Sequence, residues 1–235
     1  LKNQNLIGFE ALVRWKHATR GLIYPLEFIS LAEETGLIFP LSDWILRESC
    51  MQIRAWQKKY PGKPELRMSV NISSRLLLQP GFADSIQKNL FEQGLEPGSL
   101  AIEITESVIM DHPDRAVETM RKRPKMGVHI HIDDFGTGYS SLSYLHSFPV
   151  NALKIDRSFI AKMSANSDNQ EIIKTIIALA QNLKLEVIAE GLELNHQLSA
   201  IKDLECGFGQ GFLFSKPLSA ESIENWILSG KSFPV

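Results

Sequence analysis

Apolar and polar residues follow two patterns of spacing along the chain, one typical of buried strands and the other of amphipathic helices. Short, mostly apolar runs predict strands over residues 9–15, 66–72, 100–106, 128–134, 152–156, 186–190 and 209–214. Between these runs, apolar residues recur at helical spacing and predict helices over 26–35, 42–60, 82–93, 114–122, 170–183, 195–204 and 219–229. Residues 140–148 are expected to form a short helix or a structured loop.

Several helix boundaries carry their own signals. Gly36 directly follows an amphipathic stretch and predicts a helix end. Ser42 is expected to cap the start of the long second helix, while Ser219 and Ser222 are candidate caps for the last one.

The strict alternation of strands and helices predicts a parallel sheet, because a helix is the usual crossover between parallel strands. The predicted strands are mostly apolar, which indicates that both of their faces are buried, as in α/β proteins with helices outside the sheet. About seven such strand–helix units, with helices of similar size, favour a closed barrel of the (β/α)8 type over an open sheet. One strand would then be missing, and the chain starts at Leu1 without a Met, so we expect a single domain over 1–235 that is a fragment of a longer protein.

Composition narrows the class of protein. Hydrophobic residues make up 44% and charged residues 22% of the 235 residues, an ordinary balance for a folded domain. The net charge of −2 argues against a binder of DNA or RNA polymers. Cys50 and Cys206 share no metal-ligand or redox spacing and are expected to be buried free thiols in a reducing compartment. No apolar run reaches the length of a membrane span, and no signal peptide is visible.

Polar residues gather in or at the ends of the predicted strands, where an ionised side chain is costly unless it is paired or binds a metal. Those with oxygen atoms are Glu10, Asn71, Glu103, Asp133, Asp134, Asp156, Glu190 and Gln210, and Lys154 is a cation in the same kind of position. Oxygen ligands select Mg²⁺ or Mn²⁺ over zinc. The adjacent Asp133 and Asp134, with other acids nearby, could hold two ions, an arrangement that serves phosphate-ester hydrolysis. Lys154 would then hold a water molecule or stabilise developing charge.

Seven ordered motifs resemble the EAL domain, the bacterial phosphodiesterase that opens cyclic di-GMP to linear pGpG. They are Glu10-Ala11-Leu12-Val13-Arg14-Trp15, Val70-Asn71-Ile72-Ser73, Glu103-Ile104-Thr105-Glu106, Asp133-Asp134-Phe135-Gly136-Thr137-Gly138-Tyr139-Ser140-Ser141, Leu153-Lys154-Ile155-Asp156, Ala189-Glu190-Gly191, and Gln210-Gly211-Phe212 leading to Ser215-Lys216-Pro217. The resemblance covers essentially the whole chain and implies a TIM-like barrel and cyclic di-GMP as substrate.

The resemblance also implies roles for individual residues. Metal ligands would be Glu10, Asn71, Glu103, Asp133, Asp134 and Asp156, with Asp133 bridging two Mg²⁺ or Mn²⁺ ions and Ca²⁺ acting as an inhibitor. The catalytic set would be Glu190 as general base, Lys154 against the attacking water, and Glu10. Substrate contacts would come from Arg14, which holds a phosphate, from Leu12 and from Gln210. Glu106 would anchor the loop from Asp134 to Ser141, which couples the site to a homodimer contact.

The sequence also departs from the family pattern. The strand that normally precedes Glu10 and carries a Tyr-Gln-Pro motif is absent. Asn151 stands where Asp is more common, Pro124 interrupts a helix that usually continues, and His131 occupies a position that is usually small.

Other interpretations compete with catalysis. A receptor that binds cyclic di-GMP without cleaving it would be expected to lack metal ligands, and none is missing here. An enolase-type lyase would be expected to offer a pair of acid/base lysines, whereas only Lys154 lies at a strand end. His129 and His131 share a strand face with Asp133 but are interpreted as structural residues. We also interpret the tryptophans as core residues, with Trp15 the least certain: Trp15, Trp44, Trp56 and Trp226. The family context implies a cytoplasmic domain, in a parent protein that is membrane-attached or carries an upstream sensor or GGDEF-type domain.

Overall fold

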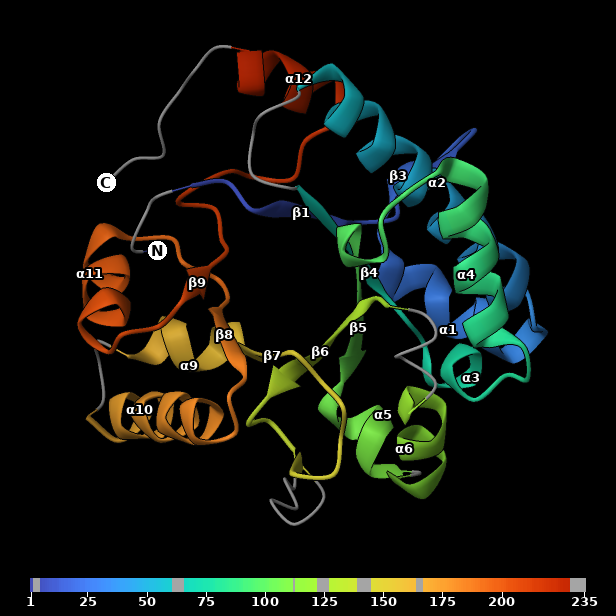
Figure 1. The fold of residues 1–235 in the computed structure, drawn as a ribbon. Coiled ribbons are helices and arrows are strands. Elements are labelled where there is room, and N and C mark those ends of the chain that lie inside the picture. Colours follow the sequence, from blue (N-terminus) through green and yellow to red (C-terminus); the bar gives the residue numbers. More distant parts are fainter. Residues whose placement is uncertain are drawn as a thin grey trace. The chain divides into compact units, whose positions relative to one another are not determined.

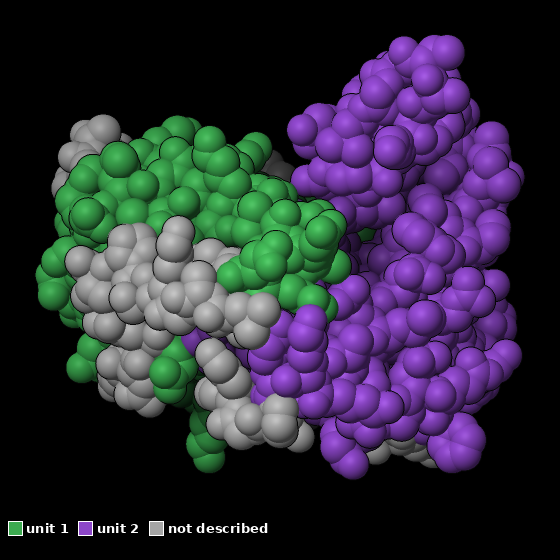
Figure 2. Space-filling view, turned by 90° about the horizontal axis from the view of Figure 1, so that it is seen from above, with its two compact units in different colours: residues 1–5, 105–111, 130–235 green, residues 6–104, 112–129 purple. Residues whose placement is uncertain are grey.

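The computed structural model describes residues 1, 5–60, 66–111, 113–121, 127–138, 145–163 and 167–228 (Figure 1). Two compact units are distinguished by colour in Figure 2. The N-terminal unit comprises residues 6–104 and 112–129, and the C-terminal unit comprises 1–5, 105–111 and 130–235.

Among the described residues, three parallel strands pair side by side in the N-terminal unit. They are β1 (Gly8–Ala11), β4 (Arg67–Asn71) and β5 (Leu100–Thr105), with β4 in the middle. The register pairs Glu10 with Ser69 and Asn71 with Glu103. Because parallel strands end at the same edge of a sheet, these oxygen-bearing residues come to the carboxyl edge of one sheet.

Helices cover this sheet on the outside (Figure 1). They are α1 (Pro25–Thr35), α2 (Ile38–Lys59), α3 (Ser74–Leu77), α4 (Phe82–Gln93), the 3₁₀ turn η1 (Pro97–Ser99) and α6 (Pro113–Arg121). The α2 helix packs against β4 and α4. Its Trp56 is buried, and the ring centroid lies 4.7 Å from that of Phe9 on β1. This aromatic contact fixes the strand that carries Glu10 to the longest helix of the unit.

In the described part of the C-terminal unit, four parallel strands pair side by side. They run in the order β6 (His129–Phe135), β7 (Ala152–Ile155), β8 (Glu186–Ala189) and β9 (Phe208–Gly209). The helices of this unit are α5 (Glu106–Asp111), α9 (Arg157–Lys162), α10 (Ser167–Asn182), α11 (Asn195–Asp203) and α12 (Ala220–Leu228). The α10 helix packs against β7, β8 and α9.

Most predicted elements are confirmed within a residue or two, but several predictions were wrong. The expected strand over 9–15 ends at Ala11, and Trp15 begins a separate antiparallel hairpin of β2 (Trp15–His17) and β3 (Gly21–Ile23). Ser42 is not a cap, because α2 begins at Ile38, and Pro40 is tolerated in its first turn, where the N–H has no partner within the helix. The last strand is only two residues long, since Gly211 turns the chain at φ 157°.

Other boundary predictions held in part. Gly36 ends α1 in the left-handed conformation at φ 75° and donates its N–H to the Glu33 carbonyl at 3.3 Å. The Ser219 hydroxyl accepts the Ser222 N–H at 3.3 Å directly before α12, so Ser219 caps this helix. Ser222 lies inside the helix, so its prediction as a cap was wrong. Pro124 and most of the stretch 140–148 lie outside the described residues.

The aromatic and sulfur predictions had mixed outcomes. Trp56 lies in the core as expected, whereas Trp15 and Trp44 are 46% and 45% exposed, so the core interpretation was wrong for both. Cys50 and Cys206 are free and buried, which confirms the prediction of buried free thiols. No helix in the described ranges has both the length and the apolar character needed to cross a bilayer.

Candidate functional site

A buried lysine surrounded by acids is the centre of the C-terminal unit's polar cluster. Lys154 on β7 is 1% exposed, and its Nζ lies 2.7 Å from Glu190 Oε1 and 3.2 Å from Asp133 Oδ1. Because an ammonium group in a protein interior is costly without counter-charges, these two ion pairs explain why a lysine is stable there. Asp133, Lys154 and Glu190 each come from the carboxyl end of a neighbouring strand or the residue that follows it.

A bulge in β6 brings both adjacent aspartates to this cluster. Ile132 pairs with Leu153 and Phe135 with Ile155, so Asp133 and Asp134 together stand opposite Lys154 alone. Consecutive residues of a regular strand point to opposite faces, but a bulge with one extra residue redirects the second side chain. Asp134 accordingly has a left-handed backbone at φ 52°, a conformation that Asp tolerates better than most residues.

The cluster has the composition of a site for a hard divalent cation. Asp133, Asp134 and Glu190 can each offer one oxygen such that the three oxygens lie within 4.8 Å of one another. Three carboxylates against the single ammonium of Lys154 leave an excess of negative charge when all are ionised. Burial raises the pKa of Asp134, and the nearby carboxylate of Asp156 raises it further. A divalent cation would relieve this unfavourable charge, and all-oxygen ligands are those that Mg²⁺ and Mn²⁺ prefer.

Asp156 and Gln210 have partners that bear on their expected roles. Asp156 caps α9, since its Oδ1 accepts the Ser158 N–H at 3.0 Å, and one of its oxygens is therefore already occupied. Gln210 is exposed directly after β9, where its backbone N–H donates to the Ala189 carbonyl at 2.8 Å and its carbonyl accepts from Leu192 N–H at 3.0 Å. These backbone bonds fix Gln210 next to the residue that precedes Glu190.

Glu106 holds the turn that follows the two aspartates. It is the first residue of α5, is 1% exposed, and its Oε2 accepts the Gly136 N–H at 2.9 Å. A Cβ added at Gly138 would lie 3.5 Å from the Glu106 carboxyl carbon, in ordinary contact. This charge-assisted hydrogen bond fixes the Gly136 amide against Glu106. That Glu106 anchors the whole loop from Asp134 to Ser141 stays a prediction. Residues 139–141 of the predicted loop lie outside the described part of the chain.

The N-terminal unit presents a second group of oxygen donors. The Asn71 Nδ2 donates to Glu10 Oε1 at 2.7 Å, and no described residue donates a hydrogen bond to the Asn71 amide oxygen, which can therefore face a ligand. Glu103 on the adjoining strand is 2% exposed and opposes Asn71 in the register. The three side chains that the sequence singled out on β1, β4 and β5 therefore share one sheet edge.

Arg14 and Leu12 lie beyond the carboxyl end of β1, in the same unit. Leu12 is 42% exposed. Arg14 donates from Nη1 to the Val13 carbonyl at 2.8 Å, and its Cζ lies 4.9 Å from the centre of the Tyr24 ring. Tyr24 belongs to none of the predicted motifs. No periodicity or spacing in the sequence signals this contact, because the two residues meet only through the hairpin.

The burial of one of the β6 histidines and the composition of the candidate metal group bear on the structural interpretation of His129 and His131. His131 is 5% exposed, in agreement with its interpretation as an interior residue. Neither His129 nor His131 belongs to the candidate metal group found among the described residues. Asn151 directly precedes β7, at a position where Asp is more common in the family. Its Oδ1 accepts the Ile130 N–H at 2.9 Å, a hydrogen bond that an aspartate at this position could also make.

Comparison with known proteins identifies the family. The model of the EAL domain matches residues 1–217. The chain therefore belongs to the EAL domain family, as the sequence motifs indicated.

Individual relatives agree with this assignment. The chain is 42% identical over 218 residues to the cyclic di-GMP phosphodiesterase NbdA of Pseudomonas aeruginosa, covering 93% of this chain and 28% of that protein. It is 40% identical over 219 residues to the cyclic di-GMP phosphodiesterase PdeR of Escherichia coli strain K12, covering 93% of this chain and 33% of that protein. The chain thus spans about a third or less of the length of these curated relatives.

A solved structure confirms the fold class. The structure described as "PaMucR Phosphodiesterase, c-di-GMP complex" matches with a TM-score of 0.88 and 42% identity, over 92% of this chain and 87% of that chain. EAL domains have the TIM-barrel fold, so the predicted α/β, TIM-like fold is confirmed.

Proposed function

We propose that this chain is a metal-dependent phosphodiesterase that hydrolyses cyclic di-GMP to linear 5′-pGpG. The observation that carries the proposal is the cluster in which Lys154 bridges Asp133 and Glu190, with Asp134 redirected towards the same place by the bulge. The family assignment and the named activities of NbdA and PdeR supply the substrate.

Within this proposal, the metal-binding residues come from several strands of the chain. Asp133 and Asp134 would hold one divalent cation, and the strand-end donors Glu10, Asn71 and Glu103 would also serve as metal ligands. When bound, Mg²⁺ or Mn²⁺ would supply Lewis-acid activation of water and neutralise phosphate charge. Asp156, which also caps α9, is proposed as a further metal ligand, and Gln210 is proposed as a substrate contact.

Glu190 is the proposed general base. It would accept a proton from the attacking water on its carboxylate, and its ion pair with Lys154 fixes the orientation of that carboxylate. Lys154 would hold the water or stabilise the developing charge with its ammonium group. Hydrolysis adds one water across one phosphodiester bond and leaves a 5′-phosphate and a 3′-hydroxyl. Arg14 would bind a phosphate of the substrate, next to Leu12.

The alternative is a receptor that binds cyclic di-GMP without cleaving it. The sequence retains every metal ligand that the family resemblance implies, and Asp133, Asp134 and Glu190 lie together around Lys154. The completeness of the set therefore favours catalysis.

Product analysis tests the proposal. Purified protein is incubated with cyclic di-GMP and Mg²⁺ or Mn²⁺, and pGpG is quantified by chromatography. We expect turnover that Glu10→Ala and Glu190→Ala abolish, whereas the control Glu171→Ala, at a side chain 72% exposed on α10, leaves it intact. Ca²⁺, with its larger and looser coordination, is expected to bind and inhibit. Binding without product would support the receptor, and unchanged turnover in either site variant would refute the mechanism.

Several properties stay predictions of the sequence. They are the homodimer coupled to the loop after Asp134, the cytoplasmic location, and an upstream sensor or GGDEF-type domain.

A further inference from the structure

An aromatic side chain outside every sequence motif lies against the proposed phosphate-binding arginine. Tyr24 connects β3 to α1 in an extended conformation, and its ring centre lies 4.9 Å from Arg14 Cζ. This distance is within the range of a cation–π contact, in which the negative face of the ring attracts the guanidinium group. The Tyr24 side chain is 53% exposed, so burial in a core does not explain its position.

The geometry of the contact leaves the arginine free to bind an anion. Guanidinium groups donate hydrogen bonds in their own plane, whereas an aromatic ring contacts the face of that plane. One N–H of Arg14 is used by the Val13 carbonyl. Within the described part of the chain, no carboxylate forms an ion pair with Arg14. Tyr24 can therefore hold the group without competing with a phosphate for its N–H donors.

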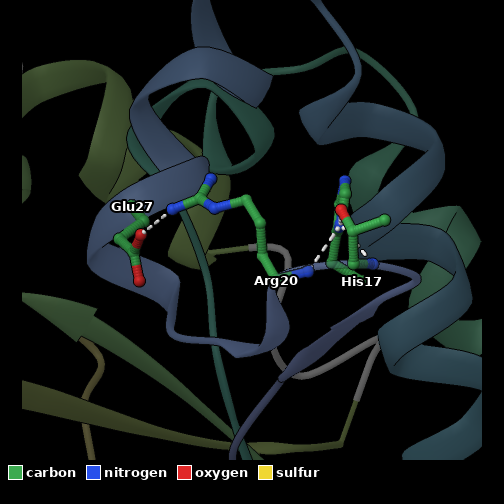
Figure 3. A network of polar contacts seen from close by, with 4 residues as sticks. His17, Arg20 and Glu27 are labelled. Atoms are coloured by element: carbon green, nitrogen blue, oxygen red, sulfur yellow. Dashed lines mark hydrogen bonds and ion pairs between the residues drawn. The ribbon is translucent and has the colours of Figure 1, made fainter.

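The segment that carries Tyr24 is held in place by its own polar network. Figure 3 shows the hairpin turn, where His17 Nδ1 accepts the backbone N–H groups of Thr19 and Arg20, each at 3.2 Å. The Arg20 Nη2 then donates to Glu27 Oε2 on α1 at 2.7 Å. These contacts tie the turn of the hairpin to the helix that starts directly after Tyr24. The ring is thus presented by a segment fixed on both sides.

We infer that Tyr24 is a positioning residue for Arg14, which it holds through the ring face so that the guanidinium edge is oriented for a substrate phosphate. The inference rests on the proposed function, because it assigns to Arg14 the phosphate of cyclic di-GMP. Its physical basis is pre-organisation, since a long arginine side chain loses less rotamer entropy on binding if it is already restrained.

Two measurements on the intact chain test the inference. Steady-state kinetics with cyclic di-GMP compares wild type with Tyr24→Ser and Tyr24→Phe. Tyr24→Ser is expected to raise KM about two- to fivefold, the size of an exposed cation–π contact, while kcat changes less than about twofold. Tyr24→Phe keeps the ring and is expected to restore the wild-type KM. In the protein without ligand, the NMR signals of the Arg14 side chain should show a ring-current shift in wild type and in Tyr24→Phe that is lost in Tyr24→Ser.

A matched control separates the contact from a general effect on the hairpin. Leu22 on β3 is exposed to a similar degree, 54%, and Leu22→Ser is expected to leave both KM and the Arg14 signals unchanged. Full hydrolysis with an unchanged KM in Tyr24→Ser would overturn the inference alone, as would Arg14 signals that do not respond to the variant. A wild-type protein that neither binds nor cleaves cyclic di-GMP would instead overturn the proposed function, and the role of Tyr24 with it.

Discussion

Replacing Lys154 by methionine tests the central cluster most directly, because this side chain is both buried and doubly paired. The Nζ lies 2.7 Å from Glu190 Oε1 and 3.2 Å from Asp133 Oδ1, and the side chain is 1% exposed. Lys154→Met keeps the length of the side chain but leaves both carboxylates without their cation. We therefore expect destabilisation in the absence of metal, together with loss of turnover.

The size of the effect follows from the burial of the partners. Removing one member of a buried ion pair costs about 3–5 kcal/mol, because the remaining charge stays buried without compensation. The Asp133 and Glu190 side chains retain 12% and 17% exposure, so water can partly solvate them and the lower end, about 3 kcal/mol, applies. For a domain of this size, this corresponds to a fall in Tm of roughly 6–12 °C.

Thermal melts in EDTA, followed by circular dichroism, measure the destabilisation. The control is Lys174→Met on α10, where the lysine is 62% exposed and 3.7 Å from Glu171 Oε1, and where a change of at most about 0.5 kcal/mol is expected. Added Mg²⁺ should raise the Tm of Lys154→Met more than that of the wild type, because the cation replaces the lost positive charge. A Lys154→Met protein that melts with the wild type in EDTA would refute the electrostatic account of the cluster.

Two further predictions concern the turn after β6 and the thiols. Glu106→Ala removes the acceptor of the Gly136 N–H, a loss worth about 1–3 kcal/mol, so hydrogen exchange at the Gly136 amide should accelerate at least several-fold. Glu106→Gln keeps an acceptor oxygen and should accelerate this exchange less. Equal exchange rates in the wild type and both variants would contradict the anchoring role. Burial raises the pKa of the Cys50 and Cys206 thiols to about 11, so at pH 8 only about a thousandth of each thiol is ionised to thiolate. A thiol reagent should therefore label these cysteines only after unfolding. Rapid labelling of the native protein would contradict this prediction, because it would show that the thiols are accessible.

The sequence predicted the elements whose physical signals are local. The α4 helix has its predicted bounds, because its apolar spacing is regular and Gly94 ends it in a left-handed conformation. Short helices escaped prediction: α3, α5 and α9 span too few residues for a helical period to show. The apolar run from Phe9 to Trp15 looked continuous, since its division between β1 and the hairpin depends on tertiary contacts of Trp15 with Phe28 rather than on the pattern.

The candidate site was predicted in part for a similar reason. Strand ends with acidic residues identified Asp133, Lys154 and Glu190, and parallel topology alone was enough to expect them at one edge. Alternation within a strand, however, would have sent Asp133 and Asp134 to opposite faces. Only the bulge explains why both serve one cluster, and a bulge leaves no mark in composition. The contact of Tyr24 with Arg14 was equally invisible, because it spans a hairpin whose existence the pattern did not indicate.

The bulge at Asp133 and Asp134 also limits how this segment can change in length during evolution. Two residues of β6 oppose one residue of β7, so the spacing between Ile132 and Phe135 determines which acid faces Lys154 and where Gly136 meets Glu106. A substitution here changes one side chain. A single-residue deletion would restore a regular ladder, yet it would remove one acid and shift the following turn by one position. We therefore expect this segment to vary in its amino acids but not to accept insertions or deletions while activity is kept.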